Sequence, residues 1–303
     1  MLTLGYSTIA PALLQVSESI TTPAVEPITP VPEPPAADPL KVALGERLFG
    51  DPRLSRGNAR RCLDCHDLGT NGASSNVRDT APDGSLLSLN TATVFNSTLS
   101  FRFGWEGAFH TLEEQAAATL QNPRIMGSRM DEVVGKLSHD PVLVHQFEAA
   151  YGHGPDSPSV LNAIATFERS LVTPGSLFDR WLAGDTAALS AQQMEGYRLF
   201  KSLGCVSCHQ GVNVGGNLFE RHGIFHPLAR AEPEILRVPS LRNIATTAPY
   251  FHDGSASSLD EAVRKMALAQ LNSTLTDQQV GEIVAFLRTL TGTYQGRSVG
   301  APR

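Results

Sequence analysis

All four cysteines of this 303-residue chain belong to two Cys-x-x-Cys-His units. The units are Cys62-Leu63-Asp64-Cys65-His66 and Cys205-Val206-Ser207-Cys208-His209. This signature is typical of covalent haem attachment. Two thiols at this spacing each add to one vinyl group of a porphyrin, and the adjacent histidine then reaches the iron. The units therefore predict two c-type haems, with His66 and His209 as the proximal iron ligands.

Two other chemistries use the Cys-x-x-Cys pattern without the histidine. A pair of redox-active dithiols needs only this spacing, and one zinc ion can take all four thiolates. Neither chemistry requires a histidine directly after the second cysteine, and here it occurs twice. The repeated histidine therefore favours haem over both alternatives.

The elements that position these units are expected to be helices. Similar segments precede the two units, Gly45-Glu46-Arg47-Leu48-Phe49 and Gly196-Tyr197-Arg198-Leu199-Phe200, which indicates a repeated helix leading into a haem loop, one per half of the chain. Capping boxes predict four helix starts. They are Thr111 with Glu114, Ser190 with Gln193, Ser258 with Glu261, and Thr276 with Gln279. The apolar residues Val280, Ile283, Val284, Leu287 and Leu290 recur at helical spacing before a stop at Gly292. These patterns predict an all-α protein in which any strands are short.

Composition excludes some partners and indicates a location. The net charge of −6 and the pI near 5.8 argue against nucleic acid. No segment after the N-terminal arm has the ~18 uninterrupted apolar residues of a membrane helix. Covalent haem attachment normally takes place outside the bacterial cytoplasmic membrane, so the motif predicts a periplasmic, cell-surface or extracellular protein.

The first 40 residues are expected to be a leader and an arm. Residues 1–14 are mostly apolar, but no Lys or Arg precedes Lys41, so the basic region of a signal peptide is missing. Seven prolines lie between Thr21 and Leu40. Such a stretch is expected to be extended or disordered and to pack no core. The folded body is therefore expected to begin near Pro39.

Several short segments outside the haem units carry a wider resemblance. They are Asp51-Pro52-Arg53-Leu54-Ser55, residues 90–96, Trp105-Glu106-Gly107, Leu112-Glu113-Glu114-Gln115-Ala116, Leu171-Val172-Thr173-Pro174, Pro239-Ser240-Leu241-Arg242-Asn243 and residues 248–254. Together they resemble the bacterial di-haem cytochrome c peroxidases and their MauG- and MbnH-type relatives, from about Leu40 to Gly292. The resemblance implies two cytochrome c-like domains, residues 41–173 and 174–303, with the haems facing the domain interface. Dimers are common among such peroxidases, so the resemblance is also consistent with a homodimer.

The resemblance assigns a different task to each haem. The first would bind hydrogen peroxide, and the second would take electrons from a small cytochrome c or a cupredoxin. Met266 falls at the family's distal methionine and would complete the His209 iron, where a thioether raises the potential. Spacing alone is equally consistent with Met266 as a core residue. His252, in the segment 248–254, would support the second haem by hydrogen bonding.

Further site residues follow from the same resemblance. Trp105 takes the place of the tryptophan between the haems, and Gln115 takes that of the distal-pocket glutamine. Asn90, Thr247 and Pro249 correspond to oxygen ligands of a calcium ion. From the sequence alone those three residues suggest nothing.

Two departures from the family pattern bear on activity. The family's acid-base glutamate lies ten residues after the distal-pocket glutamine, and position 125 is Ile125 here. Losing a positioned acid-base group costs about 10²- to 10⁴-fold in rate unless Glu106, Glu113, Glu114 or a water replaces it. Residues 67–89 contain no histidine that would close the first haem. The first haem is therefore expected to be open, with an apolar distal pocket.

Two classes of function remain open. The first is an oxidoreductase that uses hydrogen peroxide, either to oxidise a reduced carrier or, as in MauG, to oxidise a tryptophan or tyrosine of a partner protein. The second is a di-haem electron-transfer or ligand-sensing protein that kept the scaffold without turnover. Steady-state oxidation of a reduced carrier by peroxide separates the two.

Overall fold

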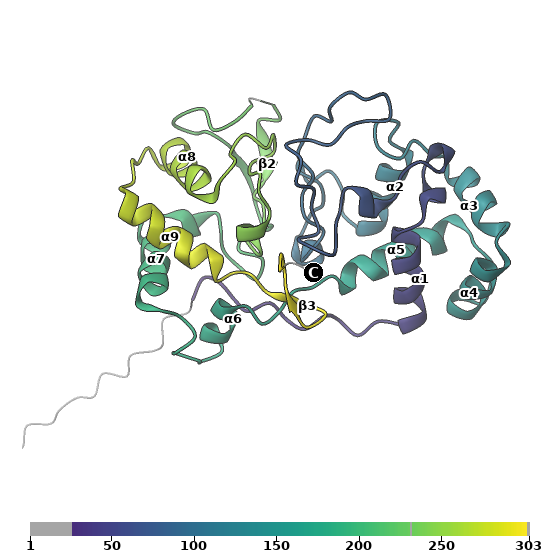
Figure 1. Ribbon diagram of the computed structural model, residues 1–303, viewed down its shortest axis with the longest axis horizontal. Coiled ribbons are helices and arrows are strands. Elements are labelled where there is room, and N and C mark those ends of the chain that lie inside the picture. Colours follow the sequence, from purple (N-terminus) through teal and green to yellow (C-terminus); the bar gives the residue numbers. More distant parts are fainter. Residues whose placement is uncertain (1–25, 231, 302–303) are drawn as a thin grey trace, which may run out of the picture.

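The computed structural model describes residues 26–230 and 232–301, and these form two helical halves joined side by side (Figure 1). The first half holds α1 (Pro39–Phe49), α2 (Leu112–Gln121), α3 (Met130–Ser138), α4 (Pro141–Tyr151) and α5 (Ser157–Ser170). The second holds α6 (Leu177–Leu182), α7 (Ala191–Ser202), α8 (Leu259–Leu271) and α9 (Asp277–Arg288). The predicted all-α class is confirmed.

Short elements connect these helices. Six 3-10 turns are described, and they are η1 (Pro52–Leu54), η2 (Arg56–Asn58), η3 (Cys62–Asp64), η4 (Ser97–Leu99), η5 (Cys205–Ser207) and η6 (Ile244–Thr246). β1 (Phe219–Arg221) pairs antiparallel with β2 (Ile235–Arg237), and β3 (Thr293–Tyr294) pairs antiparallel with β4 (Arg297–Ser298). Among the described residues, sheet is thus confined to two short antiparallel strand pairs.

The four predicted helix starts are confirmed, each at its predicted capping residue. Thr111, Ser190, Ser258 and Thr276 are the N-caps of α2, α7, α8 and α9, and each side chain accepts a hydrogen bond from the backbone N–H three residues later. These bonds satisfy N–H groups that have no partner within the helix. Local side-chain chemistry therefore decides where these helices begin.

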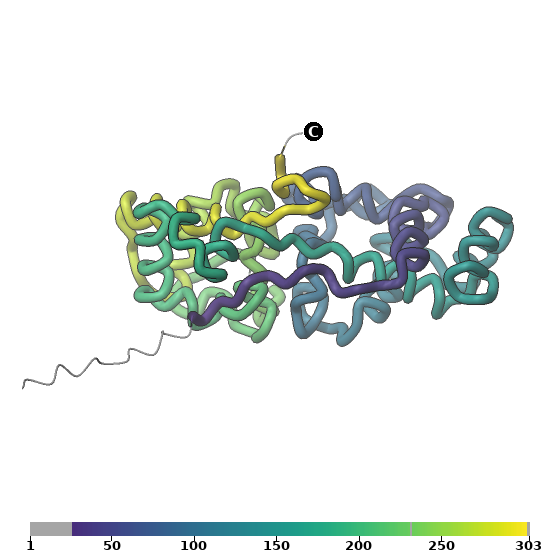
Figure 2. Tube along the Cα trace, turned by 90° about the horizontal axis from the view of Figure 1, so that it is seen from below, coloured from purple at the N-terminus to yellow at the C-terminus, as the bar shows by residue number. Residues whose placement is uncertain are grey.

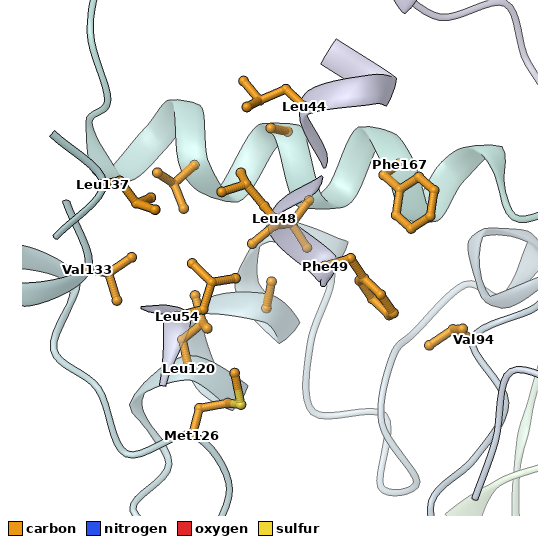
Figure 3. Packing of buried hydrophobic residues seen from close by; sticks show 14 of the residues in the cluster. Leu44, Leu48, Phe49, Leu54, Val94, Leu120, Met126, Val133, Leu137 and Phe167 are labelled. Atoms are coloured by element: carbon orange, nitrogen blue, oxygen red, sulfur yellow. The ribbon is translucent and has the colours of Figure 1, made fainter. Parts of the chain in front are cut away.

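Each half is built on one pair of crossing helices. In the first half Gly45 of α1 lies directly against the backbone of Ala163 in α5, and in the second Gly196 of α7 lies directly against that of Glu282 in α9. Around the first crossing, buried side chains from α1, α2, α3 and α5 converge, as Figure 3 shows for Leu48, Leu120, Val133 and Phe167. The repeated segment predicted before each haem unit is thus a repeated helix crossing.

The two chain ends cross between the halves. Residues 26–38 run along the second half before α1 begins, and the C-terminal hairpin turns back toward the first half (Figure 2). Ile28 is buried in the core of the second half, whereas Val299 is buried in the core of the first. Each half therefore contains a core residue from the opposite end of the chain.

The prediction that the proline-rich arm packs no core is wrong for residues 26–38, and residues 1–25 lie outside the described residues. Ile28 and Val31 are buried at 1% and 6% exposure. Proline favours an extended helix with three residues per turn, in which residues three apart share a face. Backbone groups are paired as well: Gly211 N–H donates to Pro27 O at 2.8 Å, and the Arg242 guanidinium donates to Thr29 O at 2.8 Å.

Candidate active site

The first Cys-x-x-Cys-His unit forms a tight turn after α1. Cys62 begins η3, and the His66 N–H donates to the Cys62 carbonyl at 2.9 Å. The His66 Nδ1 lies 3.1 Å from the Gly72 carbonyl. Because Nδ1 is held there, Nε2 is the ring nitrogen left to bind a metal. Burial also lowers the pKa of His66, which keeps the imidazole neutral, as an iron ligand must be.

The second unit repeats this geometry after α7. The His209 N–H donates to the Cys205 carbonyl at 3.0 Å, and Nδ1 lies 3.3 Å from the Val214 carbonyl. Burial lowers the pKa of His209 to about 4. The ring of Phe200, the last residue of the repeated segment, lies 6.4 Å from the His209 ring, and Phe49 lies 6.3 Å from His66. The same local contacts therefore position both histidines.

A cavity of about 350 Å³ lies over the first unit. Cys62, Cys65 and His66 line it together with residues of α1, α2 and α5 and of the loops around them. The lining residues are Phe49, Arg60, Arg61, Cys62, Asp64, Cys65, His66, Asn76, Asp79, Thr80, Gln115, Ala116, Thr119, Leu120, Ile125, Met126, Ile164 and Glu168. The structure thus brings Gln115 and Ile125 to the same cavity as the first haem unit.

The polar group predicted for this cavity is fixed in place. The Gln115 Nε2 donates to Thr119 Oγ1 at 2.9 Å, one turn along α2. Ile125 and Met126 add apolar surface to the same lining. Charged side chains, including those of Asp79 and Glu168, line the cavity as well, so the cavity as a whole is not apolar and the expected apolar distal pocket stays a prediction.

Glu106, Glu113 and Glu114 are not among the residues that line the cavity. Glu113 accepts two hydrogen bonds from Arg169 at 2.7 Å, and Glu114 accepts one from the His110 N–H at 2.8 Å. Glu106 is exposed. None of the three is placed to replace an acid-base group at position 125.

Two buried carboxyls that line the cavity were not predicted from the sequence, those of Asp79 and of Glu168 in α5, and Glu168 is the one without a partner. It is 7% exposed, and its Oε2 has no hydrogen-bond partner. Burial raises the pKa of Glu168 to about 8. The signal was present in the sequence, because Glu168 follows Ile164 by four residues and so falls on the buried face of a helix.

Met266 and His252, two residues assigned to the second haem, lie on different segments of the second half. Met266 is half-buried on α8, one turn after Val263, which packs against the second core. The His252 ring is buried, and its Nε2 lies 3.1 Å from the Arg230 carbonyl. The centre of the His222 ring lies 4.6 Å from that of His252, with the two rings tilted by 51°. His252 is therefore held by the loop around Arg230.

Trp105 bridges the two halves. Its Nε1 donates to the Asn90 carbonyl in the first half at 2.8 Å, and its own carbonyl accepts from the Arg237 N–H of β2 in the second half at 2.8 Å. Its ring lies 6.4 Å from that of His252 in an edge-to-face arrangement. An aromatic residue thus occupies the contact between the halves.

Of the residues assigned to calcium, Asn90 is buried next to the segment that holds the other two. The Asn90 N–H donates to the His252 carbonyl at 2.7 Å, three residues after Pro249. The Asn90 Nδ2 donates to the carbonyls of Asn76 and Val77 at 3.2 and 3.0 Å. Oδ1 is therefore the side-chain atom that a cation would bind.

The zinc and dithiol alternatives receive no support from the geometry. Within the described part of the chain, no three Cys, His, Asp or Glu side chains are grouped to hold a metal ion. Burial raises the pKa of Cys62 to about 12 and that of Cys205 to about 11. Both zinc binding and disulfide exchange need the thiolate, which these surroundings disfavour.

Comparison with known proteins decides the family. Residues 39–187 match the model of the di-haem cytochrome c peroxidases, and residues 193–291 match that of cytochrome c. Cytochrome c551 peroxidase of Nitrosomonas europaea is 38% identical over 89% of this chain and 85% of its own length. Cytochrome c peroxidase Ccp of Escherichia coli is 41% identical over 89% of this chain, which spans 62% of that protein. The chain belongs to the di-haem cytochrome c peroxidase and MauG family.

A solved structure supports the same assignment. A MauG-like protein associated with microbial copper homeostasis superposes with a TM-score of 0.74 at 26% identity, covering 86% of this chain and 93% of that one. Membership of this family of oxidoreductases implies two covalently bound c-type haems. The residues present fit them, because each unit pairs two cysteines with a neutral histidine whose Nδ1 is already held.

No helix among the described residues of this family member has the length and apolar character needed to cross a membrane.

Proposed function

We propose that this protein reduces hydrogen peroxide at the first haem site with electrons that enter through the second. The observation that carries the proposal is the cavity, in which His66 and both cysteines of the first unit share a lining with Gln115. A bound haem supplies the redox chemistry. His66 holds the iron, and Gln115, fixed by Thr119, orients the small polar molecule that enters.

The second half serves as the electron entry. His209 would hold its iron with Met266 as the partner ligand, and a thioether ligand favours the reduced state. Trp105 links Asn90 of the first half to Arg237 and His252 of the second, which supports its role as the relay between them. The electron donor would be a small cytochrome c or a cupredoxin.

This proposal has two versions, which differ in the source of the electrons. In the first, the protein is a peroxidase that takes them from the reduced carrier. In the second, it takes them from a tryptophan or tyrosine of a partner protein. Ile125 in place of the family's acid-base glutamate favours slow peroxide turnover and hence the second version. A periplasmic location accompanies both, because covalent haem attachment takes place there.

A calcium ion between the halves is part of the proposal, with Asn90 Oδ1 and the oxygens of Thr247 and Pro249 as its ligands. The support is the hydrogen bond that ties Asn90 to the His252 carbonyl. The calcium content of the purified protein tests it.

A second candidate is electron transfer or ligand sensing without turnover. It is favoured by Ile125, which brings apolar surface to the cavity of the first unit at the position of the family's acid-base group. The first haem would then bind a ligand without turning it over.

Stopped-flow absorbance into the near infrared separates the candidates. The oxidised protein is mixed with one equivalent of hydrogen peroxide, and a reduced small cytochrome c is then added. Rapid Soret changes that the donor reverses are expected for a peroxidase, and long-lived near-infrared absorbance for the oxidation of a partner protein. An unchanged spectrum would overturn the proposed use of peroxide.

A further inference from the structure

Glu168 is the buried carboxyl of the first cavity that no part of the proposed function yet uses. It projects from α5, the helix that packs against both α1 and α2, and it lines the cavity together with Ile164, one turn earlier. Its Oε2 is enclosed and has no hydrogen-bond partner. A buried carboxylate without a partner is costly, so the neutral acid is the favoured form.

The positive charges around Glu168 are already paired with other groups. Arg169, the adjacent residue, forms a two-pronged ion pair with Glu113 of α2 at 2.7 Å. Of the two arginines in the cavity lining, Arg61 pairs with Asp64 at 2.6 Å, and Arg60 donates to the Thr80 carbonyl at 2.7 Å. None of these side chains donates a hydrogen bond to Glu168, and burial, which raises the pKa of Glu168, outweighs the opposing charge of Arg169.

A second buried acid in the cavity, Asp79, has the opposite environment. Its carboxylate accepts hydrogen bonds from Ser74 at 2.8 Å, Asn76 at 2.8 Å and Thr91 at 2.5 Å. Burial opposes its ionisation, but these donors outweigh burial and lower the pKa of Asp79, whereas burial raises that of Glu168 to about 8. Two carboxyls whose environments separate their proton affinities mark the one that can donate a proton at neutral pH.

We propose that Glu168 holds the proton that is transferred in the cavity during peroxide reduction, in place of the acid-base group that Ile125 cannot supply. This inference rests on the proposed function. Reduction of one hydrogen peroxide to two waters breaks the O–O bond and consumes two electrons and two protons. The electrons come from the reduced carrier, Glu168 Oε2 gives one proton to the departing oxygen, and solvent supplies the second and returns the first.

The variant that tests this role is Glu168→Gln, which preserves size and cannot release a proton. Glu114→Gln, on the exposed side of α2, is the matched control. Steady-state oxidation of reduced cytochrome c by peroxide is expected to fall by about 10²-fold or more in Glu168→Gln and to stay unchanged in the control. Equal rates in Glu168→Gln and the wild type would overturn the inference.

A second readout does not depend on turnover. The folded protein binds the Glu168 proton up to about pH 8, whereas an unfolded glutamate loses it near 4.3. The unfolding free energy contributed by Glu168 therefore decreases as the pH rises between these values. The stability of the haem-loaded wild type relative to Glu168→Gln is expected to decline over that interval, and the infrared band of a protonated carboxyl at pH 6.5 should be absent from the variant.

These measurements separate the two proposals. If the wild type does not turn over peroxide, the proposed function fails, while the infrared band and the pH dependence still report whether Glu168 is protonated. If the wild type turns over and neither the band nor the rate depends on Glu168, the proton role alone fails. A constant stability difference between pH 4.5 and 8 would likewise contradict it.

Discussion

At the scale of single residues, the cavity beside His66 separates groups of similar chemistry by their surroundings. Asp79 has three hydrogen-bond donors and Glu168 has none at Oε2, although both are acids in one cavity. Ile125 contributes only apolar surface to the same lining. If the proposed function holds, Glu168 rather than Asp79 or Ile125 is therefore the position that supplies the proton.

Replacing Ile125 with Glu should increase peroxide turnover. The side chain at position 125 lines the cavity, so the introduced carboxyl would hold a proton next to the reacting molecule. The expected gain in steady-state oxidation of a reduced cytochrome c is about 10²-fold. Because the new acid supplies its own proton, it should also restore turnover to a Glu168→Gln variant.

Ile125→Gln is the control for this prediction. It adds polarity of similar size but no exchangeable acid at neutral pH, so its rate should stay near that of the wild type. A rate for Ile125→Glu equal to that of Ile125→Gln would show that proton supply at this position does not limit the reaction.

Among single residues, the sequence predicts those that would attach the haems and those that match the family pattern. The cysteines and histidines of both units follow from their spacing, and Gln115 and Ile125 follow from the family resemblance. The helical spacing of Glu168 from Ile164 predicts that its side chain is buried. It does not predict that Oε2 lacks a partner, because this depends on Arg169 pairing with Glu113 of another helix. Such pairings are decided by tertiary contacts.

At the scale of elements, the two halves rest on glycines where helices cross. A Cβ on Gly196 of α7 would overlap the carbonyl oxygen of Glu282 in α9 and lie 2.9 Å from Phe286 Cβ. The helices can approach this closely only because the side chain is a hydrogen. The crossing in turn places Phe200, and with it the loop that carries Cys205 and His209.

Gly196→Ala should therefore destabilise the second half by about 1–3 kcal/mol through overpacking. Gly281→Ala in α9 is the matched control, because nothing lies within 4 Å of a Cβ at that position. It should stabilise the protein by about 0.5–1 kcal/mol through helix propensity. Denaturant unfolding followed by circular dichroism measures both, and similar values for the two variants would contradict the close crossing.

The sequence predicts these helices better than the chain between them. Thr111, Ser190, Ser258 and Thr276 act on N–H groups three residues away, so the helix starts are encoded locally. The segments around the haem units have few such signals. Their contacts join distant residues, as when the Asn213 amide donates to the Asn96 carbonyl.

At the scale of the whole molecule, the chain ends hold the halves together. The arm 26–38 places Ile28 in the second core and then continues into α1 of the first half. Asp179 accepts from the Val31 N–H at 3.2 Å and pairs with the buried Arg242 at 2.8 Å. The proline-rich composition predicts the extended shape of this arm. It does not predict that the arm is buried, because only two apolar side chains, Ile28 and Val31, anchor it.

Shortening one of those anchors should reveal the arm's contribution to stability. Ile28→Ala removes a side chain that is 1% exposed and leaves a cavity in the second core, so it should cost about 2–4 kcal/mol of unfolding free energy. Glu33→Ala alters an exposed residue of the same arm and should change stability by less than about 0.5 kcal/mol. Thermal unfolding of the haem-loaded protein compares the two. If both variants unfold at the same temperature as the wild type, the arm lies on the surface without supporting the fold. If only Ile28→Ala unfolds at a lower temperature, the core of the second half is completed by the segment that continues into α1 of the first half.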